Sequence, residues 1–123
     1  MKLNHINIPV SNVQETKQFL ETFFGLECIV QKGEDTFVGM RDEAGTTLAI
    51  NNFKQVEAVS YPELFHIGFF QDNRDKVDQI HKRLKEAGFE PEDPREEHGS
   101  YTFNLKSPAG FMIEVAHDLQ TYS

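Results

Sequence analysis

The stretch that decides the fold is Ser107-Pro108-Ala109-Gly110-Phe111-Met112-Ile113-Glu114-Val115. A proline and a glycine two residues apart predict a tight turn over 107–110, and the alternation that follows predicts a strand over 111–117. Successive side chains of a strand point to opposite faces, so the apolar residues at 111, 113 and 115 share one face and Glu114 lies on the other. A carboxylate on a central strand is costly unless it is paired or coordinated, so the face of Glu114 is the candidate functional face.

Working outward from this stretch, the chain carries one order of elements twice: strand, helix, strand, strand, strand. In the first copy, the helix begins at Ser11, which forms a capping box with Gln14, and it ends at Gly25. The strands that we expect in this copy cover residues 2–10, 27–31, 36–41 and 46–53.

The second copy repeats this order from residue 64 onward. Its helix is capped by Asp72 or Asn73, carries an apolar stripe at helical spacing, and ends at Gly88. The strands that we expect in this copy cover residues 64–70, 89–91, 100–106 and 111–117. The pattern predicts a single α+β domain over residues 1–123, with one module over about 1–56 and a second over about 62–118.

The composition limits the possible functions. The 123 residues include 12 Lys and Arg against 20 Asp and Glu, and this net charge of −8 disfavours nucleic-acid binding because a phosphate backbone is repelled. The single Cys28 can form neither an internal disulfide nor a cysteine-based zinc site. No apolar run is long enough for a spanning helix, and the N-terminal segment lacks the apolar core of a signal peptide. We therefore expect a cytoplasmic protein without nucleic-acid or membrane partners.

Three side chains that can bind a metal lie on the strand faces opposite the helices: His5, His66 and Glu114. The two histidines come from the first strand of each copy, and the glutamate comes from the last strand of the second. If this face curls into a cleft, two imidazoles and one carboxylate would bind a divalent ion of Fe, Mn, Zn, Co or Ni. The periodicity leaves a second interpretation open, in which the face is simply solvated.

Four segments, in this order, carry a resemblance to a known family: Leu3-Asn4-His5-Ile6-Asn7-Ile8, Phe23-Phe24-Gly25-Leu26, Phe65-His66-Ile67-Gly68-Phe69 and the stretch over 107–115. Together they resemble the vicinal oxygen chelate superfamily. This superfamily includes glyoxalase I, extradiol dioxygenases, methylmalonyl-CoA epimerase, fosfomycin-modifying thiol transferases and bleomycin-resistance proteins. The resemblance covers nearly the whole chain.

The resemblance implies a glyoxalase/bleomycin resistance/dioxygenase fold, in which paired βαβββ modules form a curled mixed sheet around a cleft. It implies that His5, His66 and Glu114 are the ligands of one divalent metal ion. It also implies a homodimer, with the cleft completed within one chain or across the dimer. Members that only sequester drugs keep the fold without the ion.

One position departs from the resemblance. Aligning Gly45 with Gly110 places Ala49 opposite Glu114, where glyoxalase I and the epimerase have a fourth ligand, usually Glu or Gln. An alanine methyl can neither coordinate a metal nor accept a proton, so ordinary glyoxalase I activity is not expected. Three ligands without the fourth are the set found in extradiol dioxygenases and fosfomycin-modifying enzymes.

Three further residues are candidates for catalysis or substrate binding. Extradiol dioxygenases add a His and a Tyr near the metal, and His98 and Tyr101, in and just beyond an expected loop over 95–100, could supply them. The loop histidine could equally be solvated. Asn7 shares a face with His5 and could hydrogen-bond a substrate oxygen. Against a fosfomycin-modifying enzyme, no cluster of Lys and Arg marks a phosphonate pocket.

These features support two hypotheses. The leading one is a metal-dependent enzyme whose ion chelates neighbouring oxygens of a small substrate, as a dioxygenase, lyase or thiol transferase. The alternative is a metal-free binding protein, similar to bleomycin-resistance proteins, that holds an aromatic or cationic drug. The net charge of −8 favours a cationic ligand, whereas the absence of Trp removes the best stacking platform.

Overall fold

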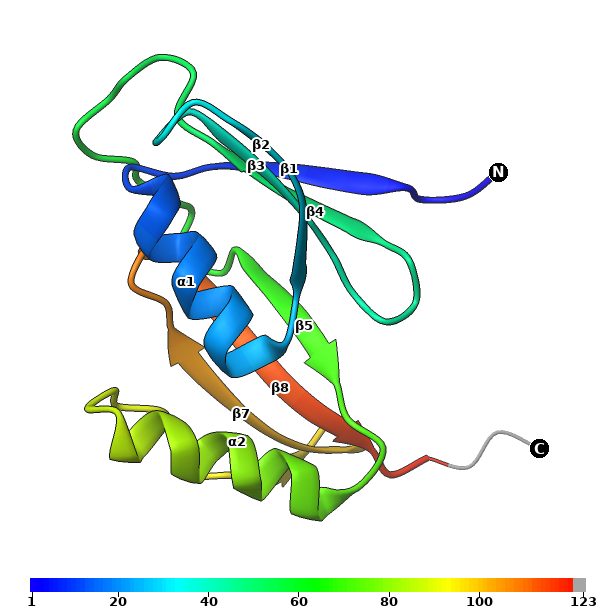
Figure 1. Cartoon of the computed structure of the whole chain (residues 1–123). Coiled ribbons are helices and arrows are strands. Elements are labelled where there is room, and N and C mark those ends of the chain that lie inside the picture. The colour runs from blue at the N-terminus through cyan, green and yellow to red at the C-terminus, as the bar shows by residue number, and fades with distance from the viewer. Residues whose placement is uncertain (121–123) are drawn as a thin grey trace. The chain divides into compact units, whose positions relative to one another are not determined.

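The computed structural model describes residues 1–120, and the chain divides into two compact units, Met1–Ser60 and Tyr61–Ser123. Each unit has the order strand, helix, strand, strand, strand (Figure 1). Each also holds one four-stranded mixed sheet with two open edges. The prediction of an α+β fold made of two βαβββ modules is therefore confirmed.

The first unit builds its sheet in the order β1-β4-β3-β2, with β1 parallel to β4 and the other pairs antiparallel. Its elements are β1 (His5–Pro9), α1 (Val13–Phe24), β2 (Glu27–Lys32), β3 (Phe37–Arg41) and β4 (Thr47–Asn51). The first strand is shorter than the expected 2–10 because β4, its partner, begins opposite His5. The core of this unit consists of apolar side chains of α1 and the central strands, among them Leu20, Val38 and Ile50.

The helix α1 begins one residue later than the sequence indicated. Asn12 is the N-cap, since its side chain accepts a hydrogen bond from the backbone N–H of Glu15 at 3.0 Å. The expectation that Ser11 caps the helix is wrong, because an equally strong capping residue occupies the last extended position of the chain before the helix. At the other end, Gly25 adopts the left-handed conformation (φ 67°) and donates to the carbonyl of Leu20, as predicted.

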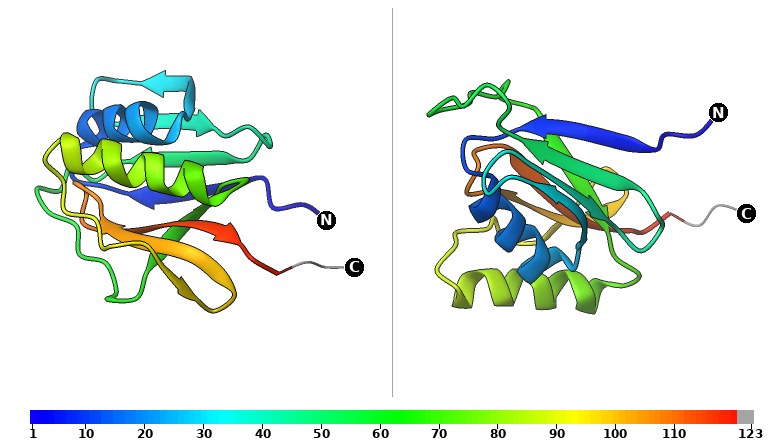
Figure 2. Two further views of the ribbon diagram at one scale, coloured as in Figure 1. Left: turned by 90° about the horizontal axis from the view of Figure 1, so that it is seen from below. Right: turned by 45° about the horizontal axis from the view of Figure 1, so that its top comes forward.

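The second unit repeats the arrangement, with the strand order β5-β8-β7-β6 and β5 parallel to β8. Its elements are β5 (His66–Phe70), α2 (Arg74–Glu86), β6 (Arg95–Glu97), β7 (Ser100–Lys106) and β8 (Met112–Asp118). Asn73 caps α2, one of the two residues expected there, and α2 packs against β7 and β8 (Figure 2). Within residues 1–120, neither helix has the length and apolar content that crossing a bilayer requires.

The strand β6 lies where the sequence did not place it. The expected strand over 89–91 is wrong, as is the expected loop over 95–100, because Arg95–Glu97 pairs with the first residues of β7. Pro91 and Pro94 have no N–H to donate to a ladder, so regular pairing begins only after the second proline. The turn is reduced to His98 and Gly99, and both have positive φ values.

The register of the two sheets makes the units equivalent position by position. Across β1 and β4, Asn7 pairs with Ala49, and across β5 and β8, Gly68 pairs with Glu114. Ala49 therefore occupies in the first unit the position that Glu114 occupies in the second. This is the equivalence that the alignment of the two turn glycines predicts.

Candidate functional site

A pocket of about 420 Å³ opens on the sheet of the second unit, on the face away from α2. The alternation of β7 explains its position. Phe103 points to α2, where it packs edge-on against His81, so the neighbouring Thr102 and Asn104 point to the other face and line the pocket. A cavity of this size suits a small molecule.

His66 and Glu114 face each other across this pocket from two adjacent parallel strands, β5 and β8. The Nε2 atom of His66 lies 4.0 Å from the Oε1 atom of Glu114. Gly68 is the residue of β5 directly opposite Glu114, and a Cβ atom at this position would lie 3.8 Å from Oε1. The glycine therefore leaves open the space beside the carboxylate oxygen that faces His66.

The remaining polar atom of each side chain is already hydrogen-bonded within the protein. His66 Nδ1 lies 3.0 Å from the carbonyl oxygen of Leu64, and because a carbonyl only accepts, Nδ1 carries a proton, which leaves Nε2 to present the lone pair of the neutral ring. Glu114 Oε2 accepts a hydrogen bond from the hydroxyl of Thr102 at 2.9 Å. The two free atoms, Nε2 and Oε1, are thus the pair that faces the pocket.

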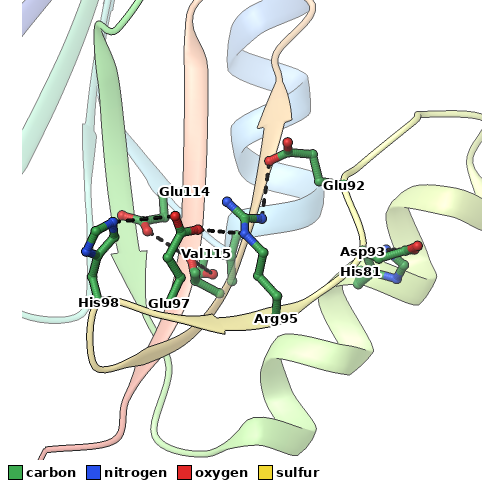
Figure 3. Close-up of polar contacts among 9 residues, drawn as sticks. His81, Glu92, Asp93, Arg95, Glu97, His98, Glu114 and Val115 are labelled. Atoms are coloured by element: carbon green, nitrogen blue, oxygen red, sulfur yellow. Dashed lines mark hydrogen bonds and ion pairs between the residues drawn. The ribbon is translucent and has the colours of Figure 1, made fainter.

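A chain of charged side chains on β6 and the residues beside it forms one wall of the pocket (Figure 3). The Nε atom of Arg95 donates to Glu97 at 2.6 Å, and its Nη1 atom lies 3.5 Å from Glu92. The hydrogen bond with Glu97 raises the pKa of Arg95. The other oxygen of Glu97 lies 3.4 Å from Nε2 of His98, so Glu97 joins the guanidinium to the imidazole.

Of the three predicted catalytic candidates, the structure places only His98 at this pocket. Tyr101 points to the opposite face, where its hydroxyl donates to Asp78 of α2 at 2.6 Å, so the structure does not bring it to the pocket. Tyr101 and Phe103 are two residues apart on the same strand, so their side chains point to the same face. This alternation in the sequence could have indicated that Tyr101 lies on the α2 side. Asn7 lies in the first unit, where its Oδ1 accepts a hydrogen bond from Asn51 at 2.7 Å.

Thr102 and Arg95 are site residues that the sequence did not indicate. Thr102 is buried, and its contact with Glu114 depends on the pairing of β7 with β8. Arg95 follows two prolines in a highly charged segment that has no strand periodicity. Only the alternation of the strand over 100–106 could have indicated that Thr102 shares the face of Glu114.

A family model supplies the decisive comparison. The model of the Glyoxalase/Bleomycin resistance protein/Dioxygenase superfamily matches residues 2–115, which is nearly the whole chain. The chain belongs to this superfamily. The resemblance seen in the four sequence segments is thereby confirmed.

Several relatives within the glyoxalase superfamily resemble this chain. A structure of a possible glyoxalase from Bacillus cereus is 41% identical, covers 94% of this chain and 98% of its own, and superposes with a TM-score of 0.83. The fosfomycin resistance protein FosX of Listeria innocua is 30% identical over 92 residues, which are 72% of this chain and 66% of the relative. The lactoylglutathione lyase of Agrobacterium tumefaciens shares the fold (19% identity, TM-score 0.75, covering 94% of this chain and 92% of its own).

Members of the superfamily typically use a divalent metal, and the pair formed by His66 and Glu114 fits one. Protein nitrogen and oxygen ligands lie about 2.0–2.2 Å from such an ion, so an ion can contact both Nε2 and Oε1 across their 4.0 Å separation. Within residues 1–120, however, no three His, Cys, Asp or Glu side chains gather as a metal-binding group. The predicted ligand His5 lies on β1 of the first unit, with Nδ1 3.1 Å from Asn4 Oδ1, and its role as third ligand stays a prediction.

Proposed function

We propose that this protein is a metal-dependent enzyme of the glyoxalase superfamily that acts on a small oxygen-containing substrate. The observation that carries the proposal is the pair of free atoms, His66 Nε2 and Glu114 Oε1, which face each other at 4.0 Å. Their partner atoms are held by the carbonyl of Leu64 and the hydroxyl of Thr102. Such outer contacts orient metal ligands and select the tautomer of a ligating histidine. The sequence predicts that His5 is the third ligand.

The residues of the pocket have distinct roles in this proposal. His66 and Glu114 hold the ion, which supplies Lewis-acid stabilisation of a substrate oxygen. The amide of Asn104, which lies opposite Glu114 on β7, orients the substrate by hydrogen bonding. His98 is the candidate for proton transfer, since Glu97 fixes Nε2 and leaves Nδ1 to accept or deliver a proton.

The charge of the pocket supports a neutral or cationic substrate. The lining includes four glutamates (Glu63, Glu92, Glu97 and Glu114) against the single Arg95. The guanidinium of Arg95 already contacts two of these carboxylates, which offset its charge. Although a relative is a fosfomycin resistance protein, the excess of carboxylates in this pocket disfavours a phosphonate.

Calorimetric titration with Mn²⁺, Fe²⁺, Zn²⁺, Co²⁺ and Ni²⁺ tests the proposal. We expect about one ion per chain, and we expect Glu114→Gln to weaken binding by roughly 10-fold or more, since the amide carries no charge. Glu63→Gln is the matched control, because it removes a carboxylate from the same pocket without touching the pair. Wild-type protein that binds none of these ions would contradict the proposal.

The second candidate is a metal-free protein that binds a small molecule in the same pocket. The observation that favours it is that only two donor side chains pair at the pocket, with no group of three over residues 1–120. In this case a ligand would bind with the same affinity before and after removal of metal with a chelator. A metal-dependent enzyme would lose substrate binding or turnover on the same treatment.

A further inference from the structure

Thr102 is a buried polar residue whose hydroxyl contacts the candidate metal ligand. It lies on β7 with 2% of its surface exposed. Its Oγ1 atom is 2.9 Å from Glu114 Oε2 and 3.0 Å from the backbone carbonyl oxygen of Val115, both on the neighbouring strand β8 (Figure 3). The hydroxyl therefore reaches across the strand pair to the side chain that faces His66.

The hydroxyl has one proton and two acceptors within hydrogen-bond distance, Glu114 Oε2 and the carbonyl oxygen of Val115. It can donate its proton to only one of them at a time. An ionised carboxylate only accepts hydrogen bonds, and a hydrogen bond to it is about twice as strong as one to a neutral carbonyl. The contact with Glu114 is also the slightly shorter of the two. When Glu114 is ionised, the proton of Thr102 therefore lies on Oε2.

The second oxygen of Glu114 is left open by the same arrangement. Gly68 has no side chain to approach Oε1, and His66 Nε2 is the nearest ionisable partner, at 4.0 Å. With Oε2 held on one side and Oε1 open on the other, the carboxylate presents a single oxygen to an ion. A rotation of the carboxylate that exchanged its two oxygens would break the hydrogen bond to Thr102.

We propose that Thr102 is the positioning residue of the metal site: its buried hydroxyl holds Oε2 of Glu114 so that Oε1 alone faces the ion. This inference rests on the proposed metal-dependent function, and it adds a specific residue that fixes which oxygen of Glu114 faces the pocket. Partners of metal ligands of this kind typically change metal affinity by 10–100-fold when they are removed.

The test compares Thr102→Val, which keeps the branched shape without the hydroxyl, with Thr102→Ser, which keeps the hydroxyl. The probe is Mn²⁺ alone, titrated into the full-length chain by calorimetry. We expect the valine variant to bind Mn²⁺ roughly 10-fold more weakly than wild type, and the serine variant to bind within about 3-fold of it. Valine binding as tight as wild type, or serine binding as weak as valine, would overturn the inference.

A double-variant comparison separates positioning from a general loss of structure. In a Glu114→Ala background the hydroxyl has no side-chain oxygen to hold at position 114, so Thr102→Val is expected to weaken Mn²⁺ binding no further. An equal loss in both backgrounds contradicts the proposed link to Glu114. Thermal unfolding verifies that each variant is folded, and Thr102→Ala replaces Thr102→Val if the latter does not fold.

A second readout needs no metal and keeps the inference distinct from the proposed function. Crystal structures of the metal-free protein are expected to show Glu114 Oε2 within hydrogen-bond distance of residue 102 in wild type and Thr102→Ser. In Thr102→Val, we expect the carboxylate in another rotamer or in several. If wild type binds no metal, the proposed function fails, and these structures still decide the role of Thr102. An unchanged Glu114 in the valine variant would refute it.

Discussion

At the level of single residues, His66 and Glu114 each have one polar atom that is hydrogen-bonded within the protein and one that faces the pocket. Nδ1 of His66 is hydrogen-bonded to the carbonyl of Leu64, and Oε2 of Glu114 is hydrogen-bonded to the hydroxyl of Thr102. The atoms without such a partner are Nε2 of His66 and Oε1 of Glu114. In the equivalent position of the first unit, Ala49 has only a methyl group, with 4% of its surface exposed. The two halves of the chain therefore share a fold and register but not the chemistry of their last strands.

This difference predicts the absence of one activity. A general base must lie within hydrogen-bond reach of the proton that it removes, and Ala49 offers no such group. We expect no isomerisation of the methylglyoxal–glutathione hemithioacetal above the uncatalysed background when thioester formation is followed by ultraviolet absorbance. Turnover on the order of 10 per second would show that another residue serves as base.

At the level of elements, the start of α1 gives a prediction with a built-in control. Asn12 caps the helix through its side chain, whereas Ser11 contributes its backbone carbonyl, which accepts from Asn52. Asn12→Ala is expected to lower the free energy of unfolding by about 1 kcal/mol, and Ser11→Ala by a few tenths at most. Urea denaturation of both variants measures this difference. Equal losses would restore Ser11 as the cap.

The contact between α2 and β7 gives a pH dependence. Asp78 accepts the hydroxyl proton of Tyr101, and this hydrogen bond raises the pKa of Tyr101 above the ordinary value of 10.0. A raised folded-state pKa means that the stabilisation is complete below about pH 10 and is lost as the pH rises through the raised value. The effect is small, because the contact lies at the surface.

Thermal unfolding from pH 7 to pH 11 checks this expectation. The difference in Tm between wild type and Tyr101→Phe should be a few degrees at pH 7 and should shrink above about pH 10. Taking the difference removes the contribution of Tyr61, whose pKa is also raised, by burial. A difference that stays constant over this range would mean that the hydrogen bond does not set the titration of Tyr101.

At the level of the whole molecule, each sheet ends in edge strands that have no pairing partner on one side within their own unit. The edge strand β5 carries Phe70 with 77% of its surface exposed, and Leu64, just before it, is 87% exposed. Exposed edges and apolar side chains of this kind are usually covered by a partner. We propose that the partner is a second copy of this chain, as the sequence resemblance implies.

Light scattering tests this proposal. We expect a mass of about twice the 14.1 kDa of one chain at micromolar concentration, and we expect Phe70→Lys to shift the mass toward the monomer. Gln79→Lys, the same charge change at an exposed position of α2, controls for effects of net charge. A monomer of wild-type protein at this concentration would exclude the dimer.

The sequence by itself determined the order of elements, the two-fold repeat and the face on which His66 and Glu114 lie. Each of these follows from local patterns: alternation assigns a side chain to one face of a strand, and glycines mark where helices end. The alternation of Phe111, Ile113 and Val115 is enough to place Glu114 opposite them. The equivalence of Ala49 and Glu114 also followed from matched turn glycines, and the register of the sheets agrees with it.

Only the tertiary structure decided which residues meet across neighbouring strands. The contact of Thr102 with Glu114 depends on the register of β7 against β8, and β6 exists because residues 95–97 meet the start of β7. The pairing of β6 leaves no periodic signal in its own segment, because two prolines and a run of charges precede this strand. Hydrogen bonds between strands distant in sequence depend on the folded geometry, and local preference cannot specify them.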